Sequence, residues 1–211
     1  MGNICRSPMM ERLLTARARE ALGEHADRVD ELLFSHSTGT GGWHVGDLMN
    51  RPAARQLLAR GADADGFAAR RLVAAHVDAS DLILTATTEQ SAHVRSLRPD
   101  AAPRTFVLGE LRRFLPQVSS GESRDTSGAA PGGLAGLPPF APTLAAVHAR
   151  GVTLVELLDR LRNGGDPQPY DDLADPWGMS EAVFSEVADQ IDAAVRPLAD
   201  ALLSGRSPWR R

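Results

Sequence analysis

With 211 residues, of which 43% are hydrophobic and 24% charged, the chain is long enough for one domain with a buried core, or for one domain that carries an insertion. Its formal net charge of −4 gives no general attraction to nucleic acid or to an anionic membrane, so neither is expected as a partner. The single cysteine has no second cysteine to pair with, no apolar run reaches the length of a membrane span, and the first residues do not form a signal peptide. These features predict a cytoplasmic protein.

The first residues, Gly2-Asn3-Ile4-Cys5-Arg6-Ser7-Pro8, combine turn-forming, cationic and capping side chains directly before an apolar helical pattern. Glycine and asparagine adopt left-handed backbone angles that turn successive N–H groups inward, and Ser7 followed by Pro8 is a strong N-cap and first-turn pair. Such a nest at a helix N-terminus binds oxyanions, and Arg6 adds a planar fork for two oxygens. We therefore predict a phosphate site made of Gly2, Asn3, Ile4, Cys5, Arg6 and Ser7.

This motif resembles the phosphate-binding loop of the low-molecular-weight protein tyrosine phosphatases, which follows the pattern Cys-x-Gly-Asn-x-Cys-Arg-Ser and uses the first cysteine as nucleophile. Met1 matches the x, so the resemblance implies that the nucleophile and the apolar strand before it lie ahead of this chain. We expect a chain truncated relative to the family, through a misassigned start codon rather than a real loss. Cys5 matches the second cysteine, on the rim of the nest beside Arg6, where an in-line attack is disfavoured. It is expected to be a half-buried packing residue.

After the nest, residues 8–22 have apolar side chains at helical spacing, and Gly23 is placed to end this helix. Leu32 to Phe34 form a short apolar run that predicts a strand. The following Ser37 to Thr40 is similar to a Ser-Ala-Gly-Thr segment of the family, whose serine supports the asparagine of the phosphate loop. The resemblance implies a contact between Ser37 and Asn3; the alternative is a plain glycine-rich turn.

The middle of the chain alternates helix and strand patterns. We expect helices over residues 52–60, 88–97 and 110–115, a central strand over 81–87 and another strand over 105–108. Alternation at this spacing implies right-handed crossovers and a parallel sheet. Gly66 to Leu72 is similar to the family segment His-x-Ala-Arg-x-Leu, but Phe67 stands where the family has a loop-supporting histidine and offers no polar atom.

Residues 117–142 are rich in Ser, Gly, Pro and Ala and predict a flexible insertion, followed by two extra helices over residues 143–150 and 152–162. The resemblance covers residues 1–116 and 166–203, with 117–165 inserted and 204–211 as a loose tail. It implies a single α/β domain of the phosphotyrosine phosphatase I-like kind, in which helices cover both faces of a short parallel sheet.

The segment Asp175-Pro176-Trp177 resembles the Asp-Pro-aromatic motif of the family, which implies that Asp175 is the general acid. The proline holds the preceding residue extended, and the aromatic ring can flank a ring-shaped leaving group. The alternative is an ordinary turn. Asp171 and Asp172 are expected to be solvated. Ser180 is predicted to cap a long helix with one apolar stripe, which ends near residue 203.

The resemblance implies hydrolysis of a phosphotyrosine protein or a small aryl phosphate, with Arg6 and Asp175 as catalytic residues and a cysteinyl-phosphate intermediate. No cofactor is expected, and no metal, because the histidines do not have ligand spacing. The chain without the cysteine is expected to be inactive, and removal of Asp175 to leave phosphate affinity nearly unchanged. The alternative is a phosphate or phosphotyrosine binder without turnover. An arsenate reductase would need further cysteines, and none follows Cys5.

Overall fold

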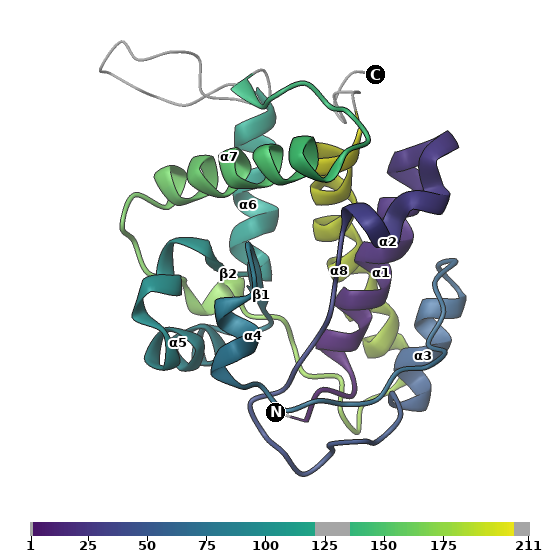
Figure 1. The fold of residues 1–211 in the computed structure, drawn as a ribbon. Helices are drawn as coiled ribbons and strands as arrows, with labels where there is room; N and C mark the ends of the chain where they lie inside the picture. The colour runs from purple at the N-terminus through teal and green to yellow at the C-terminus, as the bar shows by residue number, and fades with distance from the viewer. Residues whose placement is uncertain (1, 121–135, 205–211) are drawn as a thin grey trace.

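The structure is a computed structural model that describes residues 2–120 and 136–204. In chain order its elements are α1 (Arg6–Leu22), the 3₁₀ helix η1 (Gly23–Arg28), α2 (Val29–Leu32), α3 (Arg51–Leu58), α4 (Ala74–Asp78), β1 (Ile83–Thr85), α5 (Thr88–Leu97), η2 (Pro99–Arg104), β2 (Thr105–Val107), α6 (Leu108–Ser120), α7 (Leu144–Arg162), η4 (Pro169–Asp171) and α8 (Glu181–Leu203) (Figure 1).

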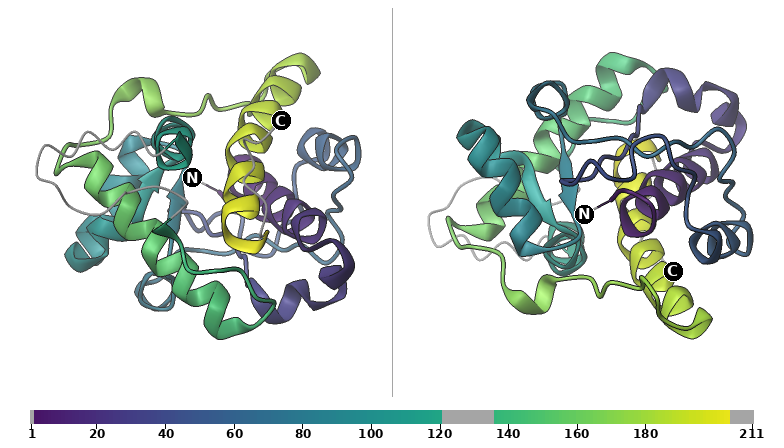
Figure 2. Two further views of the ribbon diagram at one scale, coloured as in Figure 1. Left: turned by 90° about the horizontal axis from the view of Figure 1, so that it is seen from above. Right: turned by 90° about the horizontal axis from the view of Figure 1, so that it is seen from below.

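The strands β1 and β2 pair in parallel, with Leu84 opposite Phe106. The helix α5 lies on one side of this pair, and α8 with α1 lies on the other (Figure 2). A parallel pair joined by a helix and covered by helices on both sides is the predicted single α/β domain.

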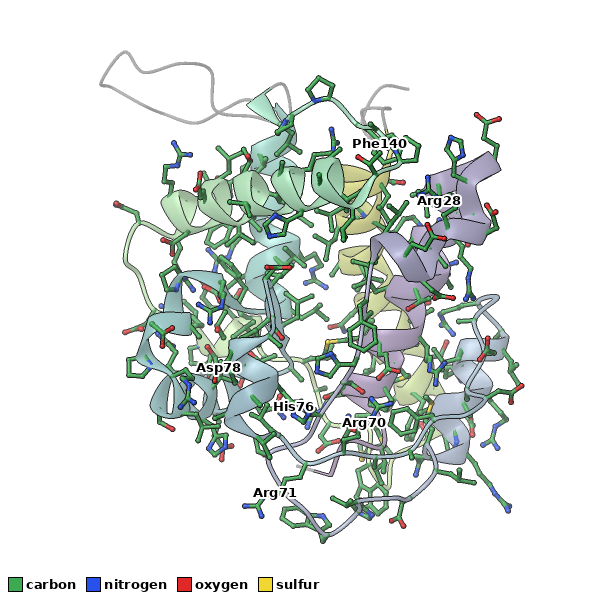
Figure 3. The ribbon with its side chains drawn as sticks, viewed as in Figure 1. Arg28, Arg70, Arg71, His76, Asp78 and Phe140 are labelled. Atoms are coloured by element: carbon green, nitrogen blue, oxygen red, sulfur yellow. The ribbon has the colours of Figure 1, made fainter. Side chains whose placement is uncertain are left out.

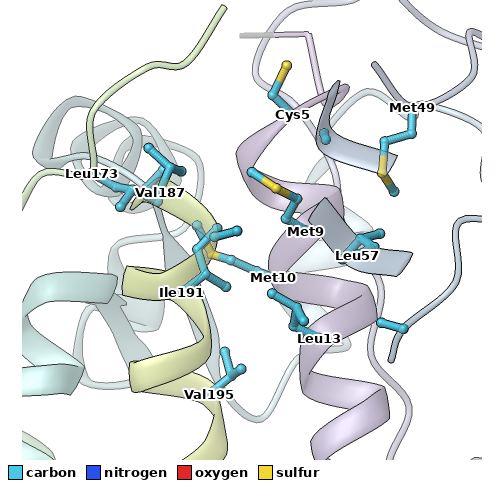
Figure 4. Packing of buried hydrophobic residues seen from close by; sticks show 14 of the residues in the cluster. Cys5, Met9, Met10, Leu13, Met49, Leu57, Leu173, Val187, Ile191 and Val195 are labelled. Carbon is cyan, nitrogen blue, oxygen red and sulfur yellow. The ribbon is translucent and has the colours of Figure 1, made fainter. Parts of the chain in front are cut away.

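The core is built mainly where α1 packs along α8. Met10 and Leu13 of α1 face Ile191 and Val195 of α8, and Leu57 of α3 closes the opposite side of α1 (Figure 4). The end of α1 was predicted correctly: Gly23 has a φ of 56°, which a residue without a side chain adopts at low cost. The helix that carries the nest is therefore held along its length by packing.

The predicted strand over Leu32 to Phe34 is wrong. Leu32 ends α2, Leu33 is extended, and residues 33–38 have no strand assignment; the Phe34 side chain is 84% exposed. A strand needs a hydrogen-bonded neighbour, and within the described residues the sheet holds β1 and β2 only, with a separate parallel bridge between Gly39 and Arg71. For the same reason β1 is not central in that sheet, since it pairs with β2 alone.

The insertion also differs from the prediction. The helix α6 runs on to Ser120 instead of stopping near residue 115, so residues 117–120 are helical. The two extra helices are one continuous helix, α7, which passes through Gly151. The reason is tertiary packing: Leu154 and Leu158 are buried, and the buried Arg150 donates hydrogen bonds to the carbonyls of Ala201 and Leu202 in α8.

Residues 121–135 of the expected flexible linker and residues 205–211 of the expected tail lie outside the described residues. The division of the chain into a domain and an insertion stays a prediction. None of the described helices combines the length and the apolar composition that a membrane crossing requires.

Candidate active site

The nest is built by the turn that leads into α1. Asn3 has a φ of 58°, one of two non-glycine residues with positive φ in the described chain. The helix begins at Arg6, with Cys5 at the N-cap and no side-chain capping bond there, so Ser7 is not the cap and Pro8 is not the first helical residue. Earlier entry into the helix leaves the amides of its first turn without a capping side chain, which is the arrangement that suits an oxyanion.

A hydrogen-bonded network holds this turn from behind. Asn3 Nδ2 donates to Ser37 Oγ over 2.9 Å, and Asn3 Oδ1 accepts from the backbone N of Arg70 over 2.9 Å. Ser37 Oγ and its backbone N both donate to Glu11 Oε2, over 2.7 and 2.8 Å. The side chains of Asn3, Ser37 and Glu11 are buried, so the bonds among these three residues are made away from competing water.

Phe67, at the position of the family histidine, is apolar, and Arg70 is the basic residue of this segment that lies near Glu11. Phe67 is buried in the core, and the Arg70 guanidinium lies 3.5 Å from Glu11 Oε2. Arg70 lies at the same end of the molecule as the N-terminus (Figures 1 and 3). Sequence reasoning missed both Glu11 and Arg70. The available signal for Glu11 was its place beside the apolar residues of the first helix, where a carboxylate is unusual.

Arg6 and Asp175, separated by 169 positions, form an ion pair. Arg6 Nη2 lies 2.9 Å from Asp175 Oδ2, and Arg6 Nη1 donates to the carbonyl of Leu173 over 2.9 Å. The Arg6 side chain is 7% exposed and that of Asp175 is 42% exposed, so the pair joins a buried guanidinium to a carboxylate at the solvent-exposed edge of the site. Asp175 Oδ1 accepts from the backbone N of Trp177 over 3.2 Å, which fixes the carboxylate in its turn.

The two other aspartates of this segment are anchors. Asp172 Oδ1 accepts from the backbone N of Thr88 over 2.6 Å, at the N-terminus of α5. Asp171 was expected to be solvated, but it is buried, and its Oδ2 accepts from Arg113 Nη2 over 2.8 Å. The close approach of the 169–171 turn to Gly109, where a Cβ would clash with the Asp171 backbone, explains this burial.

Cys5 is buried rather than half-buried, and it is not an activated thiol. Burial raises the pKa of Cys5 to about 12; the Asp175 carboxylate also raises it, and Arg6 lowers it. A thiol with such a pKa is protonated at neutral pH, whereas the nucleophile of a covalent mechanism has to be a thiolate.

A cavity of about 740 Å³ opens beside the nest. At the nest its lining includes Trp43, His44 and Trp177, and from there it extends between residues 33–39 and β1 to the helices α7 and α8. The lining away from the nest is mostly apolar. Ile83, Leu84 and Thr85 of β1 line this cavity.

A family model described as low molecular weight phosphotyrosine protein phosphatase matches residues 1–125, more than half of the chain. The chain belongs to this family. It is 38% identical over 117 residues to low molecular weight protein-tyrosine phosphatase A of Mycobacterium bovis, an alignment that covers 55% of this chain and 64% of the relative. It is 33% identical over 121 residues to the low molecular weight protein-tyrosine-phosphatase of Streptomyces coelicolor, covering 57% and 69% of the two chains.

The fold agrees with this family membership. The structure of Vibrio vulnificus Wzb in complex with benzylphosphonate matches with a TM-score of 0.56 and 18% identity, and the match covers 94% of this chain and 92% of Wzb. The chain spans just under two thirds of the length of the mycobacterial relative, 64%. Within the described residues, no group of three or more His, Cys, Asp or Glu side chains is arranged to hold a metal ion.

Proposed function

We propose that the nest, Arg6 and Asp175 are the phosphate-binding and proton-transfer parts of a phosphomonoester hydrolase that acts on phosphotyrosine. The observation that carries the proposal is the pairing of Arg6 with Asp175 at the N-terminus of α1. A guanidinium and the first-turn amides of a helix bind phosphoryl oxygens, and a carboxyl group at their edge is within reach of the leaving oxygen. Phosphotyrosine proteins or small aryl phosphates are the proposed substrates, and the cytoplasm is the proposed location.

In the family's mechanism a cysteine thiolate attacks phosphorus, the loop and the arginine stabilise the equatorial oxygens, and the aspartic acid protonates the leaving phenol. In this chain Arg6 and Asp175 would take the last two roles. Cys5 does not supply the thiolate, because its pKa is raised to about 12. The family pattern puts the reactive sulfur one position ahead of Met1. The strand before that sulfur in the pattern is apolar, and the cavity beside β1 has a mostly apolar lining that would suit it.

The second candidate function is binding of a phosphate or phosphotyrosine group without turnover. It is favoured by one observation: the oxyanion-binding parts and their support through Ser37 and Glu11 are assembled in the chain as it stands, without an activated thiol. Arsenate reduction has no such support, because the cysteine relay that it needs has no residues here.

The test compares three proteins with para-nitrophenyl phosphate as substrate: the 211-residue chain, a version preceded by an apolar strand and cysteine of the family pattern, and that version with the added cysteine changed to serine. We expect turnover in the second protein alone, and binding of inorganic phosphate in all three. Turnover by the 211-residue chain that Cys5→Ser abolishes would make Cys5 the nucleophile. Phosphate binding by all three proteins together with turnover by none of them would favour the second candidate.

A further inference from the structure

His44 joins the two loops that border the nest. Its ring centroid lies 5.8 Å from that of Trp177, with an angle of 52° between the rings. Its Nδ1 lies 2.7 Å from Asp47 Oδ2, so the ring is held from its own loop. On its other side it packs against the nest, because a Cβ added at Gly2 would clash with the His44 ring.

Trp177 passes this contact on to Asp175. The backbone N of Trp177 donates to Asp175 Oδ1, and Asp175 Oδ2 accepts from Arg6. A continuous set of contacts therefore runs around the mouth of the site, from Asp47 through His44 and Trp177 to Asp175 and Arg6.

The loop that carries Asp175 has few other restraints near its tip. Leu173 is anchored by a backbone hydrogen bond to Ala86, and Pro176 is buried, but the side chains beyond them are open to solvent. Trp177 is 55% exposed and Met179 is 57% exposed. The contact with His44 joins this exposed tip to the opposite loop, in addition to the Arg6–Asp175 ion pair.

We propose that His44, oriented by Asp47, is a positioning residue that keeps Asp175 over the nest. This role deepens the proposed function and rests on it, since Asp175 is there the general acid. A direct consequence concerns Arg6, whose Nη2 is paired with the Asp175 carboxylate. Loss of His44 loosens the tip of the loop, so the carboxylate pairs less often with Arg6 Nη2 and an oxyanion meets less competition there.

The first test titrates inorganic phosphate into the 211-residue chain by calorimetry, in a double-mutant cycle of His44→Ala and Asp175→Asn. We expect His44→Ala to lower the Kd at least threefold, Asp47→Ala to do so by a smaller factor, and His44→Ala to add nothing in the Asp175→Asn background. The exposed His93→Ala serves as a control and should leave the Kd unchanged. An effect of His44→Ala that is equal in both backgrounds would contradict a role through Asp175. Weaker binding in both would mean that His44 contacts the anion directly.

A second measurement follows the contact itself and does not depend on phosphate binding. In a chain with Trp43→Phe and Trp209→Phe, Trp177 is the only tryptophan, and excitation at the red edge of its absorption avoids emission from Tyr170. We expect acrylamide to quench this emission more strongly after His44→Ala and to quench it as in the parent after His44→Phe, which keeps a ring against Trp177. Unchanged quenching in His44→Ala would overturn the proposal. If the parent binds no phosphate, the proposed function fails, while the quenching result still decides the role of His44.

Discussion

Changing Asp175 to asparagine should make the site bind inorganic phosphate more tightly. The carboxylate lies 2.9 Å from Arg6 Nη2, so an oxyanion that binds this nitrogen must displace it. Asparagine keeps the shape of the side chain and can still accept from the Trp177 N–H, but it has no charge. The expectation from sequence, that phosphate affinity hardly depends on Asp175, did not include this competition.

The size of the effect follows from exposure and charge. Because Asp175 is 42% exposed, its ion pair with Arg6 contributes about 1 kcal/mol rather than the several expected of a buried pair. Repulsion between the carboxylate and a bound phosphate about 4 Å away adds about 1 kcal/mol at the dielectric constant of water. Together these terms of about 1 to 2 kcal/mol correspond to a Kd lower by about 5- to 30-fold.

Calorimetric titration of phosphate into both proteins measures this directly. Asp27→Asn makes the same change of charge in η1, beyond the far end of α1, about 25 Å along the helix from the nest, and serves as the matched control. A Kd for Asp175→Asn equal to that of the control would refute the competition. Weaker binding would show that Asp175 helps to hold the anion.

Three further predictions concern stability and reactivity. Gly109→Ala should destabilise the protein by about 1 to 3 kcal/mol in a denaturant melt, because the new Cβ clashes with the Asp171 backbone. A Cβ added at Gly151 would lie 3.7 Å from Leu202 Cδ2, so Gly151→Ala should be neutral or stabilise the protein by up to about 1 kcal/mol. Equal effects of the two substitutions would contradict the packing of the 169–171 turn. Burial, with His76 and Arg70 nearby, lowers the pKa of His36, so the unfolded chain takes up a proton first as the pH falls below about 6.5. Stability should then decrease with falling pH by at most about 1.4 kcal/mol per unit from this group, and His36→Gln should flatten that slope in melts between about pH 6.5 and 5. Since the pKa of Cys5 is raised to about 12, iodoacetamide at about pH 8 should alkylate it at least about 100-fold more slowly than a model thiol, as mass spectrometry can follow; rapid alkylation would mean that the thiol is ionised.

Local signals predicted some elements closely. The helix expected over residues 88–97 is α5, because Thr87 caps it by accepting from the backbone N of Gln90 and Arg98 leaves it in an extended conformation. The end of α1 at Gly23 rests on a positive φ that glycine adopts freely. These features depend on neighbours within a few residues, so the sequence contains all of their cause.

Elements that depend on distant partners were not predictable in this way. Leu32 to Phe34 has the composition of a strand, but no strand of the described sheet pairs with it, so this segment is not a strand. Gly151 looked like a break between two helices, and the packing of α7 against α8 carries the helix through it. The partners of Glu11 come from segments that sequence spacing does not connect to α1.

The sequence by itself determined the family, the nest at the start of α1, and the pair of residue types, an arginine after the nest and an aspartate before a proline, from which the function is proposed. These are short motifs whose chemistry is contained in adjacent residues. Only the tertiary structure decided that Arg6 and Asp175 form an ion pair across 169 positions. It also decided that Arg70 pairs with Glu11 and that His44 lies against Trp177. Such contacts depend on how α1, α8 and the connecting loops pack together, and the free energy of that packing is shared among many residues that no single motif contains.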